Sequence, residues 1–132
     1  MNFELLKELC LLNGTSGDEK NVRDFIISRL PDDCSYTVDV LGNLIVNKKG
    51  ETEPKNKVAL FAHMDEVGFI VTYISDDGFV NVANVGGIDN SALFGKKLTI
   101  NGQVGVAGAK AIHQCGSDEA KKIPEITDVS VD

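Results

Sequence analysis

The sequence predicts an α/β protein in two parts: part of a mixed-sheet α/β domain over residues 1–67, and an incomplete all-β domain over residues 68–132. Three observations predict this organisation. Apolar residues near the N-terminus recur at helical spacing, a short continuous apolar run follows at residues 58–62, and helical periodicity is absent from residue 68 to 112. The length of 132 residues suits one domain or two small ones.

Two helices are expected before residue 31. The first is predicted from apolar residues at helical spacing, with Asn2 as its cap, Cys10 as a small core residue and Asn13-Gly14 at its end. The segment "SGDE", residues 16–19, predicts a capping box for the second helix, in which the Ser16 hydroxyl accepts from the Glu19 amide. Pro31 ends that helix, and its apolar face is formed by Val22, Phe25, Ile26 and Leu30.

The period then changes from helical to alternating. The segments "YTVDV" and "NLIVN" flank Leu41-Gly42, which predicts two strands joined by a turn. The run "VALFA", residues 58–62, is apolar without alternation and predicts a strand covered on both faces. After Gly68 come "FIVTYI", "FVNVANV" and "KLTI", with tight turns expected at Asp77-Gly78 and Asn101-Gly102.

Composition excludes several classes of function. Thirteen basic residues stand against twenty acidic ones, and the net charge of −7 argues against a sequence-independent grip on nucleic acid. The sequence contains no apolar stretch of the roughly 18 residues that a membrane span needs. The three cysteines form no C-x-x-C pair, which argues against a thiolate zinc site. We expect a cytoplasmic protein with no nucleic-acid or membrane partner.

The candidate site lies in "AHMDE", where the apolar run ends. Ligands collect beyond the carboxyl ends of strands in open α/β sheets. On an extended backbone His63 and Asp65 project to the same side. An imidazole can bind a metal through one ring nitrogen while a carboxylate orients it. The alternative is a strand-end histidine satisfied by its own loop, with Glu66 as a solvated charge.

A resemblance adds to this interpretation. The segment "AHMDEVGFIV", residues 62–71, resembles the signature of the glutamyl-aminopeptidase family, which includes the tetrahedral TET aminopeptidases and whose members are also labelled endoglucanase or cellulase M. Other segments resemble the family in order along the whole chain: "LLKELCLLNGTSGDEKNVRDFI", "VDVLGNLIV", "DDGFVNVANVGGID", "GVAGAKAIH" and "KKIPEITDVSVD".

The resemblance implies a metal-dependent aminopeptidase with two divalent metal ions, zinc or cobalt, and a peptide substrate. By position His63 matches a terminal metal ligand. Asp65 matches the catalytic-site carboxylate that orients this histidine. The inserted β domain, barrel-like in the family, implies a homodimer or a higher homo-oligomer.

The chain departs from the family pattern in extent. The bridging aspartate, the base glutamate and the other ligands of the family lie downstream of the inserted domain, and this sequence stops at Asp132. We therefore expect an N-terminal portion that is inactive alone and binds no metal tightly, since a catalytic zinc needs about three protein ligands. His113 is expected to be structural, and Asp132 has no assigned role. Departures within the β domain fall at Ala107, Ala109, Ala111, Gln114 and Cys115.

Two alternatives of other classes remain. The chain is a dimerising or assembly module if unpaired sheet edges bind another copy. It is an endoglucanase if two carboxylates face each other across a sugar cleft. Asp65 and Glu66 are adjacent, so on an extended backbone they point to opposite sides, which disfavours sugar chemistry.

Overall fold

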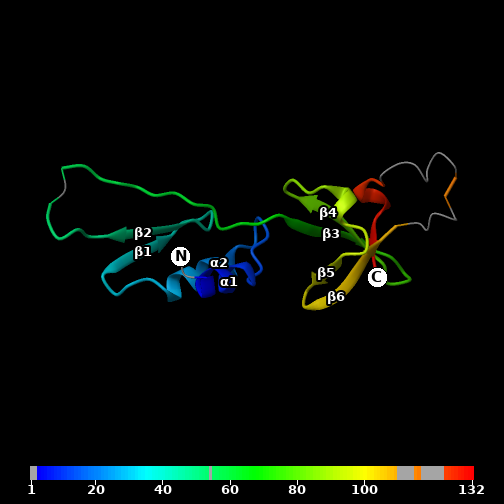
Figure 1. Cartoon of the computed structure of the whole chain (residues 1–132), viewed down its shortest axis with the longest axis horizontal. Helices are drawn as coiled ribbons and strands as arrows, with labels where there is room; N and C mark the ends of the chain where they lie inside the picture. Colours follow the sequence, from blue (N-terminus) through cyan, green and yellow to red (C-terminus); the bar gives the residue numbers. More distant parts are fainter. Residues whose placement is uncertain (1–2, 54, 110–114, 117–123) are drawn as a thin grey trace. The chain divides into compact units, whose positions relative to one another are not determined.

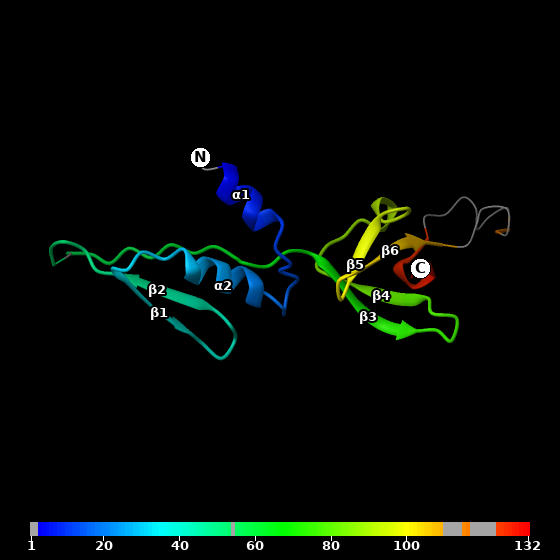
Figure 2. The same ribbon diagram turned by 90° about the horizontal axis from the view of Figure 1, so that it is seen from below.

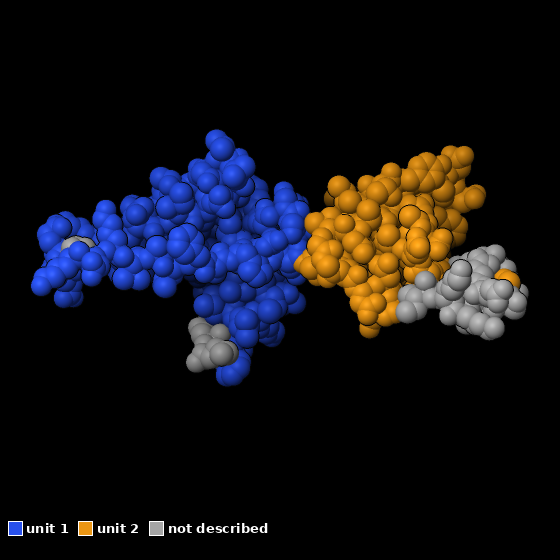
Figure 3. All heavy atoms as spheres, turned by 90° about the horizontal axis from the view of Figure 1, so that it is seen from above, with its two compact units in different colours: residues 1–66 blue, residues 67–132 orange. Residues whose placement is uncertain are grey.

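The chain folds into two compact units, residues 1–66 and 67–132 (Figure 3). The computed structural model describes residues 3–53, 55–109, 115–116 and 124–132. Helices and antiparallel sheets are both present, so the expected mixed α/β content is confirmed. Each unit is described by itself below.

Two α-helices open the first unit. Helix α1 spans Phe3–Cys10 and helix α2 spans Lys20–Ser28, so α2 ends two residues before Leu30, which was expected on its apolar face. Cys10 is exposed, and α1 buries none of its residues, so the expectation of a core cysteine is wrong. Arg29 donates to Glu8 at 2.5 Å and stacks over the Phe25 ring, with its guanidinium carbon 5.0 Å from the ring centroid. No helix in the described part of the chain is long and apolar enough to cross a membrane.

The predicted capping box does not form. The N-cap of α2 is Glu19, and no side chain accepts a hydrogen bond there. The Glu19 carboxylate instead accepts from the Gly17 amide at 2.6 Å. The Ser16 hydroxyl donates to Asp65, a residue 49 positions away. The Ser16 hydroxyl therefore makes a tertiary hydrogen bond in place of the predicted local capping bond. The other predicted cap, Asn2, lies outside the described residues.

A β-hairpin follows, as predicted. Strand β1, Cys34–Val38, pairs antiparallel with β2, Leu44–Lys48 (Figures 1 and 2). Asp39 organises the turn: Oδ1 accepts from the amides of Leu41 and Asn43 at 2.9 Å each, and Oδ2 accepts from Asn43 Nδ2 at 2.8 Å. The Asn43 side chain, followed by these amides, lowers the pKa of Asp39 below its ordinary value. Gly42, with φ of 87°, supplies the left-handed residue that the turn needs.

The apolar run at residues 58–62 is not a covered strand, and this prediction is wrong. The segment belongs to no strand, and Val58, Leu60 and Phe61 are 86%, 94% and 94% exposed. A strand is stabilised by neighbours that pair with its backbone and cover its faces. Among the described residues, no strand pairs with this segment.

The second unit contains a five-stranded antiparallel sheet in the order β3-β4-β7-β6-β5. Its strands are β3 Gly68–Ile74, β4 Val80–Val85, β5 Lys97–Ile100, β6 Gln103–Gly108 and β7 Ser130–Val131. Two short 3₁₀ helices, η1 Asn90–Ala92 and η4 Ile126–Asp128, accompany the sheet. At the β5–β6 turn, Asn101 and Gly102 have φ of 48° and 80°, as tight hairpin turns require. Closure of this sheet into a barrel stays a prediction.

The buried core of the described residues lies in the second unit. It consists of Val82, Leu93, Ala107, Val129 and Val131. Ala107, one of the positions that depart from the family pattern, is 1% exposed and pairs with Val131 across β6 and β7. The small alanine therefore sits at the centre of the packing. The departures at Ala111 and Gln114 lie outside the described residues.

Candidate functional site

The candidate site is built where residues 63–66 run beside the loop of residues 14–16. Thr15 and Glu66 form a parallel bridge. The Glu66 amide donates to the Gly14 carbonyl at 2.8 Å, and the Ser16 amide donates to the Glu66 carbonyl at 3.2 Å. The Gly14 amide in turn donates to Glu66 Oε1 at 3.2 Å. The 14–16 loop thus hydrogen-bonds to both the backbone and the side chain of Glu66. Glu66 is exposed, so its interpretation as a solvated charge is not contradicted.

Gly14 permits this close approach. The residue is buried, and a Cβ added there would lie 2.7 Å from Val22 Cγ2 and 3.3 Å from the Met64 carbonyl oxygen. The first distance is shorter than real Cβ contacts allow. The loop therefore fits between helix α2 and the 63–66 segment because residue 14 has no side chain.

His63 is held by Asp65. Its Nδ1 lies 2.9 Å from the Asp65 carbonyl oxygen and 3.0 Å from Asp65 Oδ1. A carbonyl oxygen only accepts, so Nδ1 is the donor, and a neutral imidazole then has its lone pair on Nε2. The His63 side chain is 84% exposed. The ring nitrogen that can bind a metal is thus the one that Asp65 does not use.

Each carboxylate oxygen of Asp65 accepts a hydrogen bond from a different side chain. Oδ1 accepts from His63, and Oδ2 accepts from the Ser16 hydroxyl at 2.5 Å. The Ser16 hydrogen bond is the main cause that lowers the pKa of Asp65, and the hydrogen bond and charge of His63 act in the same direction. Donors on both oxygens therefore favour the ionised form of Asp65.

This donor set fits one ligand of a metal ion. A histidine that donates its other ring nitrogen to a carboxylate is the usual arrangement of a metal-binding imidazole. Within the described residues there is no group of three or more His, Cys, Asp or Glu side chains that could hold a metal together. The described residues therefore offer one oriented donor, to which further ligands must be added.

The remaining candidates lie elsewhere. His113 lies outside the described residues. Asp132 extends the pairing of β6 and β7, because its amide and carbonyl exchange hydrogen bonds with Val106 at 3.1 and 2.9 Å. Sequence reasoning missed Ser16 and Gly14, since it assigned the serine to a helix cap and the glycine to a helix end. The segment "NGTSG" indicates a loop, but its composition does not show that the loop contacts residues 63–66.

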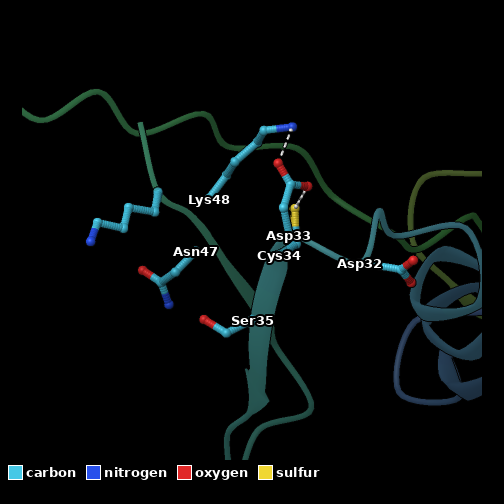
Figure 4. Close-up of a pocket in the computed structure, with 7 residues that line it drawn as sticks. Asp32, Asp33, Cys34, Ser35, Asn47 and Lys48 are labelled. Atoms are coloured by element: carbon cyan, nitrogen blue, oxygen red, sulfur yellow. Dashed lines mark hydrogen bonds and ion pairs between the residues drawn. The ribbon is translucent and has the colours of Figure 1, made fainter. Parts of the chain in front are cut away.

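A separate shallow hollow of about 360 Å³ lies at the open end of the β1–β2 hairpin (Figure 4). Lys48 Nζ lies 3.1 Å from Asp33 Oδ2, and this carboxylate raises the pKa of Lys48. Cys34 Sγ donates to the other oxygen of Asp33 at 3.8 Å. Its lining consists of Asp32, Asp33, Cys34, Ser35, Asn47, Lys48 and Lys49, which does not include His63 or Asp65. Among the charged residues of this hollow, Lys48 and Asp33 pair with each other.

Comparison with known proteins identifies the lineage. The fold matches part of a solved aminopeptidase. The profile of the M42 glutamyl aminopeptidase family matches residues 42–132, more than half of the chain. The chain therefore belongs to the M42 glutamyl aminopeptidase family.

Individual relatives agree with this assignment. The chain is 43% identical over 107 residues to the protein FrvX of Escherichia coli K12, covering 80% of this chain and 29% of the relative. It is 33% identical over 138 residues to the glutamyl aminopeptidase of Lactococcus lactis, covering 98% of this chain and 39% of the relative. The chain thus spans well under half of the length of these relatives.

Solved structures match the fold. The aminopeptidase APDkam598 of Desulfurococcus kamchatkensis superposes with a TM-score of 0.82 at 32% identity, over 98% of this chain and 36% of that one. The Pyrococcus horikoshii TET1 peptidase, described as assembling into a tetrahedron or a large octahedral shell, gives 0.79 at 34% identity, over 98% and 39%. A Thermotoga maritima protein named endoglucanase gives 0.71 at 41% identity, over 96% and 43%.

Proposed function

We propose that this chain is the N-terminal portion of a metal-dependent aminopeptidase, in which His63 binds a divalent metal ion through Nε2. The observation that supports the proposal is the hydrogen bond from His63 Nδ1 to Asp65, which leaves Nε2 with its lone pair on an exposed ring. Membership of the M42 family supplies the chemical context.

The residues of this chain have distinct tasks in the proposed reaction. His63 binds the metal, and Asp65 keeps the imidazole proton on Nδ1 and fixes the direction of the ring. A divalent metal, when bound, lowers the pKa of a water ligand toward ~7 and polarises the peptide carbonyl. Zinc and cobalt both suit an imidazole with carboxylate partners.

This chain alone is proposed to lack aminopeptidase activity. A catalytic zinc takes about three protein ligands and a water, and the described residues contain no group of three donors. The test is hydrolysis of leucyl- and glutamyl-anilides by the purified chain. Turnover that disappears in the His63→Ala variant would contradict this proposal.

Metal binding tests the site directly. Zinc is titrated into the chain while the imidazole resonances of both histidines, His63 and His113, are followed by NMR. We expect weak binding that shifts the His63 ring nitrogen Nε2 and is lost in His63→Ala. His113→Ala is the matched control and should leave this shift unchanged. If saturating zinc leaves the His63 resonances in place, the assignment of His63 as a ligand is wrong.

A second candidate function is an assembly module without catalysis. The exposed apolar segment 58–62, with Leu60 and Phe61 each 94% exposed, favours it, because unpaired backbone next to apolar side chains invites pairing with another chain. Sedimentation equilibrium should then show a homodimer or larger assembly that the Leu60→Ser/Phe61→Ser double variant dissociates. A clean monomer at high protein concentration would dispose of this function.

Sugar chemistry receives no support from the site. Asp65 accepts from Ser16 and His63, and Glu66 accepts from the Gly14 amide, so both carboxylates are bound within the chain. A glycosidase needs two carboxylates that face each other across a sugar. Release of reducing sugar from a soluble glucan, lost in Asp65→Asn, is the result that would reopen this alternative.

A further inference from the structure

We propose that Ser16 is a positioning residue of the metal site, acting through Asp65 on His63. The metal part of this inference rests on the proposed function, whereas the hydrogen bonds that carry it are features of the chain itself. They join two segments that lie 49 residues apart in the sequence.

The three side chains form a continuous series. Ser16 Oγ donates to Asp65 Oδ2 at 2.5 Å, and His63 Nδ1 donates to Asp65 Oδ1 at 3.0 Å. Each carboxylate oxygen therefore has its own side-chain donor, so both the position and the rotation of the carboxylate are fixed. A carboxylate with one donor could still turn about its own axis.

Packing does not fix the orientation of these side chains. The side chains of His63 and Asp65 are 84% and 40% exposed, so few neighbours restrict their rotamers. An exposed side chain keeps one orientation only when hydrogen bonds offset the rotamer entropy that it loses. The Ser16 hydroxyl supplies such a bond, and the Ser16 backbone is itself tied to the same segment, because its amide donates to the Glu66 carbonyl at 3.2 Å.

The serine is available for this role because it is not a helix cap. Helix α2 begins at Lys20 with no side-chain cap bond, so removing the Ser16 hydroxyl takes no hydrogen bond from the helix. After its removal His63 keeps the bond from Nδ1 to the Asp65 carbonyl oxygen at 2.9 Å. The tautomer is therefore retained, while the carboxylate and the ring lose their fixed orientation.

The experiment compares Ser16→Ala with the unaltered 132-residue chain in two measurements. Without metal, the three-bond couplings across the Cα–Cβ bonds of Asp65 and His63 report their rotamers. With zinc, the NMR titration gives the affinity of His63. We expect single-rotamer couplings to become averaged in Ser16→Ala. We also expect the zinc affinity to fall by up to about tenfold, the lower end of the range for partners of metal-binding histidines.

Three further variants make the result specific. Ser16→Thr keeps a hydroxyl and should restore both measurements. Ser28→Ala removes a serine hydroxyl of the same unit that donates to the Phe25 carbonyl at 2.6 Å, and should change neither. Ser16→Cys keeps the size of the side chain with a weaker donor. It gives the coupling measurement without metal should the alanine variant not fold, because a thiolate would itself bind zinc.

The outcomes separate this inference from the proposed function. Unchanged couplings and zinc affinity in Ser16→Ala, or unchanged couplings in Ser16→Cys, overturn the positioning role even if His63 binds zinc. Averaged couplings in a chain whose His63 binds no zinc support the positioning of the ring by Ser16 and overturn the proposed function alone.

Discussion

Replacing Gly14 with alanine tests how the 14–16 loop reaches the site. The new Cβ would lie 2.7 Å from Val22 Cγ2 and 3.3 Å from the Met64 carbonyl oxygen. Carbon atoms in ordinary contact lie about 3.5–4.0 Å apart, so either the Val22 side chain or the backbone at residue 14 must move by roughly 1 Å. Overpacking of this kind costs about 1–3 kcal/mol.

The matched control is Gly50→Ala. Its Cβ would meet only the Thr52 carbonyl oxygen, at 3.4 Å, and neither Gly14 nor Gly50 has a φ in the left-handed region. Both substitutions therefore lower the entropy of the unfolded chain alike, by about 0.4–1 kcal/mol. The difference between the two variants isolates the collision with Val22. We expect Gly14→Ala to be less stable than Gly50→Ala by about 2 kcal/mol.

The assay is urea unfolding followed by circular dichroism at 222 nm, because both described α-helices belong to the first unit. A Val22→Ala change removes the colliding methyl group and should recover most of the loss in the double variant, a coupling of about 1–2 kcal/mol. Equal stability of Gly14→Ala and Gly50→Ala, or no recovery with Val22→Ala, would refute the packing that we describe.

The remaining predictions concern the hairpin and the sheet. Asp39→Asn should lower the urea midpoint at pH 7. Because the folded pKa of Asp39 is depressed, its contribution is present above about pH 4 and is lost as the pH falls through the folded pKa, so the difference in midpoint should shrink as the pH is lowered below about 4. Gly105→Ala would place a Cβ 2.5 Å from Val131 Cγ1 and should destabilise the second unit by about 3 kcal/mol, seen as faster amide exchange in β6. Gly108→Ala, with no atom within 4 Å, is its control and should leave exchange unchanged.

Local signals predicted most of the elements correctly. The β1–β2 hairpin follows from alternating residues around Leu41-Gly42, and Asp39 binds the turn amides that such a turn leaves free. The β5–β6 turn at Asn101-Gly102 follows from residues that tolerate a positive φ. These predictions hold because the responsible interactions join residues a few positions apart.

Predictions that depend on distant partners failed. Residues 58–62 have the composition of a covered strand, yet the described chain gives them no strand to pair with, and they are exposed. Cys10 lies among leucines in the sequence, but α1 buries none of its residues. Burial is a property of what packs against a segment, and the composition of that segment does not specify its neighbours.

The sequence alone determined the lineage, the two strands of the first hairpin and strands β3, β4 and β5 of the second unit. It also placed His63 and Asp65 close enough along the chain to pair. Only the tertiary structure decided what holds that pair. Ser16 has the local context of a helix cap, and its hydroxyl can make that bond or the one to Asp65. Chain folding brings the Asp65 carboxylate to 2.5 Å from the Ser16 hydroxyl oxygen. A charged acceptor binds a hydroxyl more strongly than a neutral one.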